Sequence, residues 1–325
     1  MSAALLVDVL REPKCGETLS TAQWSDLICV ARAERLLASF ALRLKGLAIP
    51  PDVALLLDAA ITDAEVGRAQ ALWEAEMARR ALAPLGVPVV LLKGTAFVAA
   101  GLDAGRGRLI GDLDILVPRD RLNEVEAALL AAGWEWVKPD PYDDAYYRRW
   151  MHELPPLIHR DRDCMIDVHH TILPLTARPT PDATALIEAS VPLENGLRVL
   201  SPEDMIVHAA AHLLADGDLA GGLRNLWDID RLLNENMSLT FGESLMRRAK
   251  VHGLSREVGL ALKLRDDIFC GDVPTNFFTA RLLARDGWGR PTRPLLRFAF
   301  YLRSHWLRMP PLMLARHLWT KWRKG

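Results

Sequence analysis

Residues 91–117 read LLKGTAFVAAGLDAGRGRLIGDLDILV, and the last nine place two carboxylates inside an apolar run. LIGDLDILV has the composition of a buried strand. Side chains alternate along a strand, so Asp112 and Asp114 share one face while Leu113 and Ile115 occupy the other. Two like charges about 7 Å apart on a buried face repel, and a divalent cation such as Mg²⁺ would compensate them. On the D-x-D pattern alone, the favoured alternative is a strand end that emerges into solvent, where two aspartates pay no desolvation penalty.

Strand and helix patterns alternate on both sides of this run. We expect strands at 87–92 (VPVVLL), 109–117, 134–138, 146–150, 156–159 and 164–170. A short helix is expected from residue 95 to about 100, and another helix after residue 122 that Gly133 closes. The middle of the chain is therefore predicted to be of the α/β type.

Helical periodicity dominates the rest of the chain. Helices are expected at 22–47 and 52–83, and then at 202–215, 222–235, 241–264, 276–285 and 291–325, the last interrupted at Pro310-Pro311. This pattern predicts three regions: an N-terminal helical region at 1–84, a core at 85–175, and a C-terminal helical domain with a basic tail at 176–325.

The composition is that of a folded globular protein: 325 residues, of which 50% are hydrophobic and 25% charged. The N-terminal MSAALLVDVLREPK lacks the basic region of a signal peptide, and no window has about 18 uncharged apolar residues, so no membrane span is expected. The scattered cysteines predict reduced, mostly buried thiols in a cytoplasmic protein. They are Cys15, Cys29, Cys164 and Cys270.

The charge is unevenly distributed, because the chain from residue 287 onward has nine basic side chains and no acidic ones. The tail could contact nucleic acid or an anionic membrane. The favoured alternative is that its aromatic residues pack on the acidic body, with arginine stems lying over apolar surface. These aromatic residues are Phe298, Tyr301, Trp306, Trp319 and Trp322.

Two further motifs strengthen the case for a metal. Lys93-Gly94-Thr95 lies at a predicted strand-to-helix junction, where backbone N–H groups and a hydroxyl can bind phosphate. By itself this motif would be an ordinary turn with a helix cap. Asp167, in MIDVHH, is a third carboxylate in a strand-like context. Three carboxylates beside a phosphate cradle suit two-metal phosphoryl chemistry.

The order LLKGTAF, R-x-x-G-D-L-D-I-L-V and I-D-V-H resembles the DNA-polymerase-β-type nucleotidyltransferase superfamily. More narrowly, it is similar to a branch of bacterial nucleotidyltransferase-family proteins of unassigned substrate. The motifs cover residues 85–175. The superfamily's Gly-Ser pair corresponds to Gly94-Thr95, its D-x-D pair to Asp112 and Asp114, and its third carboxylate to Asp167.

There are two departures from the superfamily pattern. Thr95 stands where serine is commoner, which preserves the hydroxyl, and His170 follows His169 where an aromatic residue is frequent. Neither departure removes a metal ligand. The resemblance implies an α+β fold, with a small mixed β-sheet nucleotidyltransferase core flanked by N-terminal helices and a C-terminal helical bundle.

The resemblance also implies a chemistry. A nucleoside triphosphate would lose its monophosphate to a hydroxyl acceptor and release pyrophosphate, with two Mg²⁺ ions held by the three aspartates. Asp167 would also accept a proton from the attacking hydroxyl. Arg108 and Lys93 would reach phosphate oxygens, although surface charge near a loop is an equal alternative for both. The acceptor expected is a small molecule, with a protein side chain less favoured.

Several histidines are open to more than one interpretation. His208 and His212 are four residues apart, and with Asp228 they could bind zinc in a phosphohydrolase. Because residue 209 is alanine, the glutamate of H-E-x-x-H is absent, and helix-packing histidines are favoured. His169 alternates toward the face of Asp167 and could orient substrate.

Two rival functions fit parts of the pattern. A glycosyltransferase that uses a sugar nucleotide also has a D-x-D motif, but the early Gly-Thr pair and the lack of a Rossmann-like N-terminal half argue against it. The second rival is a catalytically inactive nucleotide-binding or regulatory module. Retention of all three carboxylates speaks against that alternative.

Overall fold

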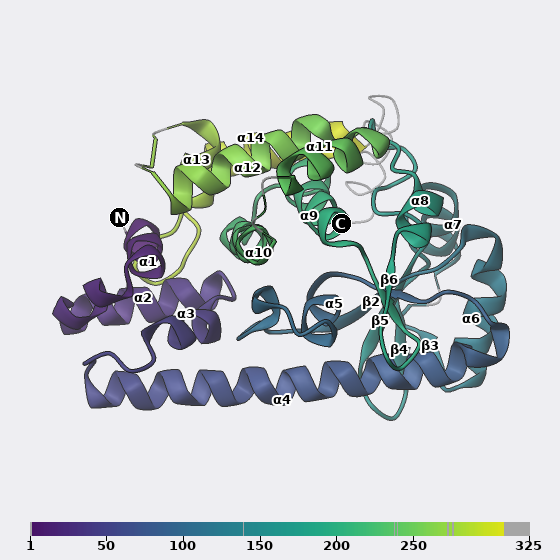
Figure 1. Ribbon diagram of the computed structural model, residues 1–325, viewed down its shortest axis with the longest axis horizontal. Helices are drawn as coiled ribbons and strands as arrows, with labels where there is room; N and C mark the ends of the chain where they lie inside the picture. Colours follow the sequence, from purple (N-terminus) through teal and green to yellow (C-terminus); the bar gives the residue numbers. More distant parts are fainter. Residues whose placement is uncertain are drawn as a thin grey trace.

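The computed structural model describes residues 2–308 except residues 139, 237, 239, 272 and 275. These residues form one mixed seven-stranded sheet in the order β3-β4-β5-β2-β1-β7-β6. The strands are β1 (Val90–Leu91), β2 (Asp112–Leu116), β3 (Trp134–Trp136), β4 (Leu157–His159), β5 (Met165–His169), β6 (Val191–Pro192) and β7 (Arg198–Val199). With helices on either side of the sheet (Figure 1), the fold is α+β, as predicted.

Strands β2 and β5 are parallel neighbours, and their register places Asp114 opposite Asp167. On the other side of β2 lies β1, which is antiparallel to β2 and parallel to β7. The strands predicted within 87–92, 109–117, 134–138, 156–159 and 164–170 are confirmed. Strands β6 and β7 follow residue 175, in a region expected to be helical. They have only two residues each, too few to show a period in the sequence.

Four helices precede the sheet: α1 (Ser2–Arg11), α2 (Thr21–Ala33), α3 (Leu37–Leu44) and α4 (Pro51–Leu82). The single helix predicted at 22–47 is wrong, because the chain turns between α2 and α3, where Arg35 adopts a φ of 56°. The helix predicted at 52–83 is confirmed as α4. Pro51 starts it, and Gly86, with a φ of 62°, follows its end. In Figure 1, α4 runs along the whole molecule and passes beneath the sheet.

The middle of the chain contains α5 (Lys93–Ala99), α6 (Leu122–Ala131) and α7 (Pro141–Trp150). The strand predicted at 146–150 is wrong, since these residues end α7. The aromatic residues of YYRRW mimic a strand, but the helix is stabilised by Pro141 in its first turn and by an ion pair in which Arg148 Nε lies 2.8 Å from Asp144 Oδ1.

The described part of the C-terminal region contains seven helices. They are α8 (Ala183–Glu188), α9 (Pro202–Ala211), α10 (Gly222–Glu235), α11 (Phe241–Val251), α12 (Ser255–Phe269), α13 (Phe277–Leu282) and α14 (Pro294–Arg308). The start of α9 is capped as its sequence predicts, because the Ser201 hydroxyl accepts a hydrogen bond from the Asp204 amide. After α9, residues His212–Asp216 form a π-helical turn. The single helix predicted at 241–264 is wrong, since Gly253, with a φ of 65°, separates α11 from α12.

Four short 3-10 turns connect these elements. They are Pro13–Thr18, Ala83–Leu85, Asp103–Gly105 and Arg119–Arg121. The cysteines are free but not buried, contrary to the prediction, because Cys15 lies in the first of these turns and Cys270 caps the C-terminus of α12 at the surface. Within the described part of the chain, no helix is long and apolar enough to cross a membrane.

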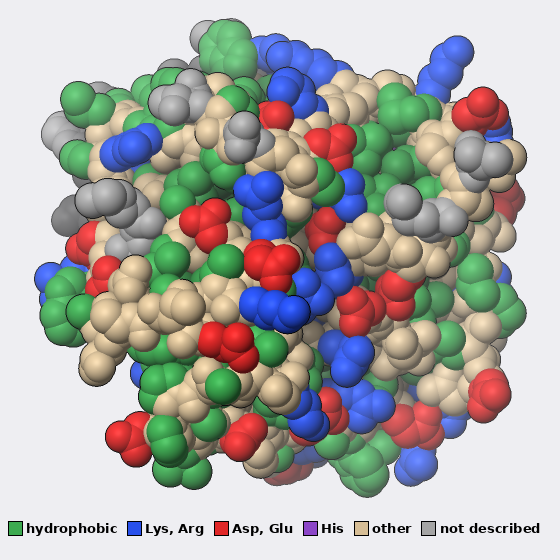
Figure 2. Space-filling model, turned by 60° about the vertical axis from the view of Figure 1, so that its left-hand side comes forward, with side chains coloured by type: hydrophobic (Ala, Val, Ile, Leu, Met, Phe, Trp, Pro, Cys, Tyr) green, Lys and Arg blue, Asp and Glu red, His purple; other side chains and the backbone are tan. Residues whose placement is uncertain are grey.

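The basic tail is described as far as Arg308, so Pro310-Pro311, Trp319 and Trp322 lie outside the described residues. Phe300 of α14 is fully buried and stacks on Phe277, with ring centroids 5.0 Å apart. Phe298, Tyr301 and Trp306 do not pack as expected, because they point away from the side of α14 on which Phe300 lies and are 59%, 38% and 47% exposed. Elsewhere on the surface, acidic and basic side chains are interspersed on the face shown in Figure 2.

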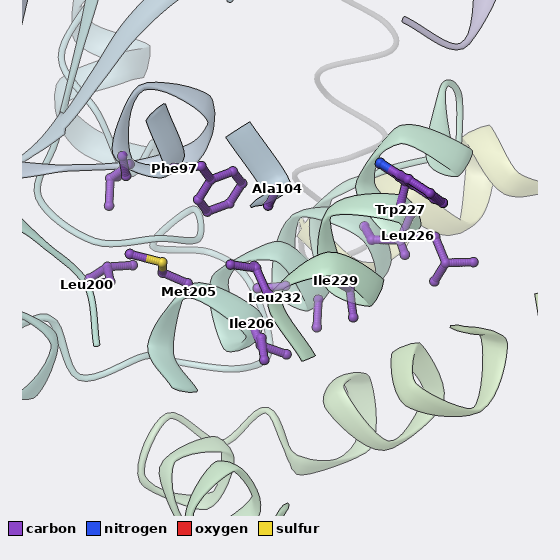
Figure 3. Packing of buried hydrophobic residues seen from close by; sticks show 14 of the residues in the cluster. Phe97, Ala104, Leu200, Met205, Ile206, Leu226, Trp227, Ile229 and Leu232 are labelled. Atoms are coloured by element: carbon purple, nitrogen blue, oxygen red, sulfur yellow. The ribbon is translucent and has the colours of Figure 1, made fainter. Parts of the chain in front are cut away.

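The main core joins the sheet to helices on both sides. Phe97 of α5, Met205 of α9 and Trp227 of α10 belong to this core, and Figure 3 shows Phe97 and Met205 on one side of the view and Trp227 on the other. Packing therefore fixes the start of α5 against the C-terminal bundle, next to the strand that carries the two aspartates.

Candidate active site

Three carboxylates meet at the centre of the sheet. Asp112 starts β2, Asp114 follows two residues later, and Asp167 lies on β5 opposite Asp114. Each of the three offers an oxygen atom, and these atoms lie within 4.8 Å of one another. Leu113 and Ile115 are buried, as expected for the other face of the strand. The carboxylates therefore face a common point, while Asp112 itself is exposed.

Asp114 is buried and has two basic neighbours. Its Oδ1 lies 2.6 Å from Lys93 Nζ and 2.9 Å from His169 Nε2. Burial alone would raise the pKa of Asp114, but the hydrogen bond from His169 and the charge of Lys93 outweigh burial and hold that pKa well below its ordinary range. Asp114 is therefore ionised at neutral pH.

Asp167 has the opposite environment. Burial and the nearby carboxylates of Glu153 and Asp114 raise the pKa of Asp167 to about 7. Near neutral pH, Asp167 is thus poised to hold or release a proton.

The motif KGT forms the first turn of α5, directly after β1. Lys93 adopts a φ of 49°, in the left-handed region, which orients the start of the helix. Thr95 is 1% exposed, and its Oγ1 has no hydrogen-bond partner among the described residues. A buried hydroxyl without a partner is costly in a folded protein, so this group is available to a ligand.

Arg108 crosses over Gly94. A Cβ atom on Gly94 would lie 2.5 Å from Arg108 Nε, so only glycine lets the arginine side chain lie here. The guanidinium group forms an ion pair with Asp228 and lies 5.6 Å from the ring centroid of Phe97, while its Nε has no partner among the described residues. The arrangement brings Arg108 to the KGT motif, while its role in phosphate binding stays a prediction.

The histidines for which zinc binding is the less favoured alternative line a pocket. His208 and His212 line a small pocket of about 50 Å³, together with Lys93, Arg108 and Asp228. Asp228 instead binds two arginines, because Arg224 pairs with it as well. Among the described residues, the groups that could hold a metal ion do not include His208 or His212.

Sequence reasoning missed two residues beside the aspartates. Glu153 Oε2 lies 3.5 Å from His169 Nε2 and 3.6 Å from His152 Nε2. His169 itself lies on the face of Asp114, as the strand alternation predicts. Glu153 and His152 follow α7 and reach the site through an isolated bridge to β5, a contact between distant segments for which the sequence shows no signal.

Asp112, Asp114 and Asp167 supply the hard oxygen donors that a divalent cation such as Mg²⁺ requires. Lys93 supplies a positive charge next to them, and Thr95 Oγ1, two residues along the same turn, is a donor without a partner among the described residues. The combination suits a substrate that carries phosphate and a metal together.

No curated protein matches the chain. Among solved structures, the chain is similar to the solution structure of the antibiotic-resistance factor ANT(2'')-Ia, at 14% identity and a TM-score of 0.39, with 61% of this chain and 96% of that chain covered. The model of a family described as "uncharacterised nucleotidyltransferase" matches residues 20–269. Because this match spans most of the chain and contains all three aspartates, the chain belongs to that nucleotidyltransferase family.

Proposed function

We propose that the protein is a Mg²⁺-dependent nucleotidyltransferase that transfers a nucleoside monophosphate from a nucleoside triphosphate to a hydroxyl acceptor. The observation that carries this proposal is the cluster of Asp112, Asp114 and Asp167, which Lys93 of the KGT turn contacts through Asp114 at 2.6 Å. Membership of the nucleotidyltransferase family supports it.

The donor set fits the metal that this chemistry requires. Asp112, Asp114 and Asp167 would hold Mg²⁺, because their oxygen atoms converge and oxygen is the ligand that Mg²⁺ prefers. When bound, Mg²⁺ would neutralise the phosphates and stabilise the charge on the attacking and leaving oxygens.

The residues of α5 and the loop after it would bind the phosphates. Thr95 Oγ1 donates a hydrogen bond to a phosphate oxygen, which satisfies an otherwise orphaned buried group. Lys93 adds positive charge at the same turn, and the unpartnered Nε of Arg108 lies against Gly94. These contacts orient the triphosphate for attack at its α-phosphorus.

Proton transfer falls to Asp167. As the acceptor oxygen bonds to the α-phosphorus, the bond from that phosphorus to the bridging oxygen breaks and pyrophosphate leaves. The hydroxyl proton passes to the carboxylate of Asp167, which lies opposite Asp114 on the neighbouring strand.

We favour a small molecule as the acceptor, with a protein side chain as the second choice. The pocket lined by His208, His212 and Asp228 adjoins Lys93 and would hold polar groups of the acceptor. A cytoplasmic location follows from the proposal, because nucleoside triphosphates are held there.

The test is to incubate the protein with Mg²⁺, each α-labelled nucleoside triphosphate and a cell extract, and to identify the molecule that acquires label. Calorimetry of Mg²⁺-dependent triphosphate binding accompanies it, with Asp112→Ala as the site variant and the exposed Asp120→Ala as the matched control. We expect label transfer with pyrophosphate release, and loss of binding in Asp112→Ala alone. Unchanged binding in Asp112→Ala would refute the site. Binding without any transfer would instead indicate a nucleotide-binding module.

A further inference from the structure

A second cluster of potential ligands lies beside the three aspartates. Glu153 Oε2 lies 3.6 Å from His152 Nε2 and 3.5 Å from His169 Nε2. One ligand atom from each residue lies within 4.8 Å of the other two. The side chains of His169, His152 and Glu153 are only 1%, 12% and 16% exposed, so the cluster is largely shielded from water.

The backbone holds these residues in place. The amide of Leu154 donates to the Val168 carbonyl at 2.9 Å, and the amide of His170 donates to the His152 carbonyl at 2.8 Å. Glu153 itself forms an antiparallel bridge with His169. The segment that carries two of the ligands is therefore fixed on β5, which carries the third, so little conformational entropy would be lost when an ion binds.

The spacing and chemistry suit a transition metal rather than Mg²⁺. Zinc bonds of about 2.0–2.1 Å in tetrahedral geometry place ligand atoms about 3.3–3.5 Å apart, which is close to the two distances from Glu153 to the histidines. Two imidazole nitrogens and one carboxylate favour Zn²⁺ and related ions, whereas Mg²⁺ selects oxygen. Two histidines and a glutamate also leave a position open for water or substrate.

The surrounding charges favour a divalent cation. Glu153, Asp114 and Asp167 bring three carboxylates to this region, against the single ammonium group of Lys93. The His169 Nε2 atom that faces Glu153 also lies 2.9 Å from Asp114 Oδ1, so a bound metal ion would replace the hydrogen bond between His169 and Asp114.

We propose that His152, Glu153 and His169 form a second cation site, which binds Zn²⁺ or a similar transition-metal ion next to the three-aspartate cluster. This site does not depend on the proposed transferase activity. It would place an additional Lewis acid beside the three-aspartate cluster.

Co²⁺ is the probe, because it replaces Zn²⁺ and its visible absorption reports nitrogen ligands in low coordination. The full-length protein is stripped with a chelator and titrated with Co²⁺. We expect one equivalent of Co²⁺ with visible bands, displaced by Zn²⁺ but not by excess Mg²⁺. His152→Gln and Glu153→Gln should each weaken Co²⁺ binding by at least about 100-fold.

Three variants serve as controls. The bands should persist in His170→Gln, in His208→Gln and in Asp112→Asn, because none of these residues belongs to the cluster. Thermal melts check that each variant folds. The proposal would be overturned if the wild-type protein showed no bands. It would also be overturned if the bands persisted in both His152→Gln and Glu153→Gln, or if they were lost in Asp112→Asn or His208→Gln. If the wild-type protein shows the Co²⁺ bands but does not bind nucleoside triphosphate, the result would count against the proposed function alone.

Discussion

Asp114 and Asp167 lie directly opposite each other on parallel strands, yet their environments separate their pKa values. Lys93 and His169 keep Asp114 ionised, whereas burial and the neighbouring carboxylates raise the pKa of Asp167 to about 7. The ionised Asp114 is suited to binding a cation, and Asp167 is suited to transferring a proton.

Asp167→Asn should stabilise the metal-free protein at alkaline pH. The pKa of Asp167 rises from 3.8 to about 7 on folding, so the folded state holds its proton more tightly than the unfolded state. Stability is therefore lost as pH rises from about 4 to about 7, and the asparagine variant, which has no proton to release, avoids this loss. We expect a gain of about 1–3 kcal/mol in the free energy of unfolding at pH 8, and almost none at pH 4.

Urea unfolding in a chelator, at both pH values, measures this gain. Asp161→Asn, at an exposed position, is the matched control and should change stability little at either pH. An equal effect of Asp167→Asn at pH 4 and pH 8 would contradict the argument. Added Mg²⁺ should stabilise the wild-type protein more than the variant, because the variant lacks one carboxylate ligand.

Much of the candidate site follows from local sequence pattern. The apolar runs of β1, β2 and β5 predict buried strands, and alternation within β2 predicts that Asp112 and Asp114 share a face. Asp167 joins them because parallel pairing of β2 and β5 sets one register along the whole strand.

Other features depend on contacts that local pattern does not encode. Glu153 reaches the site through a bridge between segments, and the pairing of Arg108 with Asp228 joins residues 120 positions apart. The breaks after α2 and α11 are single turns at Arg35 and Gly253, which interrupt an otherwise continuous helical period. In α7, aromatic residues typical of strands are overridden by capping and by an ion pair along the helix.

Thr95→Val should separate ligand binding from stability. Valine has nearly the same shape but no hydroxyl, so the change removes a buried group that has no partner among the described residues. We expect the free energy of unfolding to stay the same or rise by up to about 1 kcal/mol. Triphosphate affinity should fall about tenfold, because the phosphate loses a hydrogen bond. Calorimetry should show that Thr95→Ser retains the affinity, and equal losses in the two variants would exclude a role for the hydroxyl.

Gly94→Ala should disturb Arg108. The new methyl group would lie 2.5 Å from Arg108 Nε and 3.1 Å from its Cδ, so the arginine must shift although Asp228 holds its guanidinium group. We expect a loss of about 1–3 kcal/mol in the free energy of unfolding. Gly259→Ala in α12 is the control, because its methyl group meets nothing within 4 Å and alanine favours the helix by about 1 kcal/mol. In the Arg108→Ala background, Gly94→Ala should cost much less, and equal costs in the two backgrounds would rule out the clash.

Lys93→Met should strengthen Mg²⁺ binding to the nucleotide-free protein while it weakens nucleotide transfer. The ammonium group lies 2.6 Å from Asp114 Oδ1, so it competes with a cation for that carboxylate. Its removal should raise Mg²⁺ affinity by about tenfold, and it should lower the free energy of unfolding without metal by about 2–4 kcal/mol, because Asp114 loses a partner. Calorimetry measures the Mg²⁺ affinity, thermal melts with and without Mg²⁺ measure stability, and release of pyrophosphate measures transfer. The exposed Lys45→Met is the control. Weaker Mg²⁺ binding in Lys93→Met would mean that Lys93 supports the cation site instead of competing for it, and the assignment of Asp114 as a ligand would then have to be abandoned.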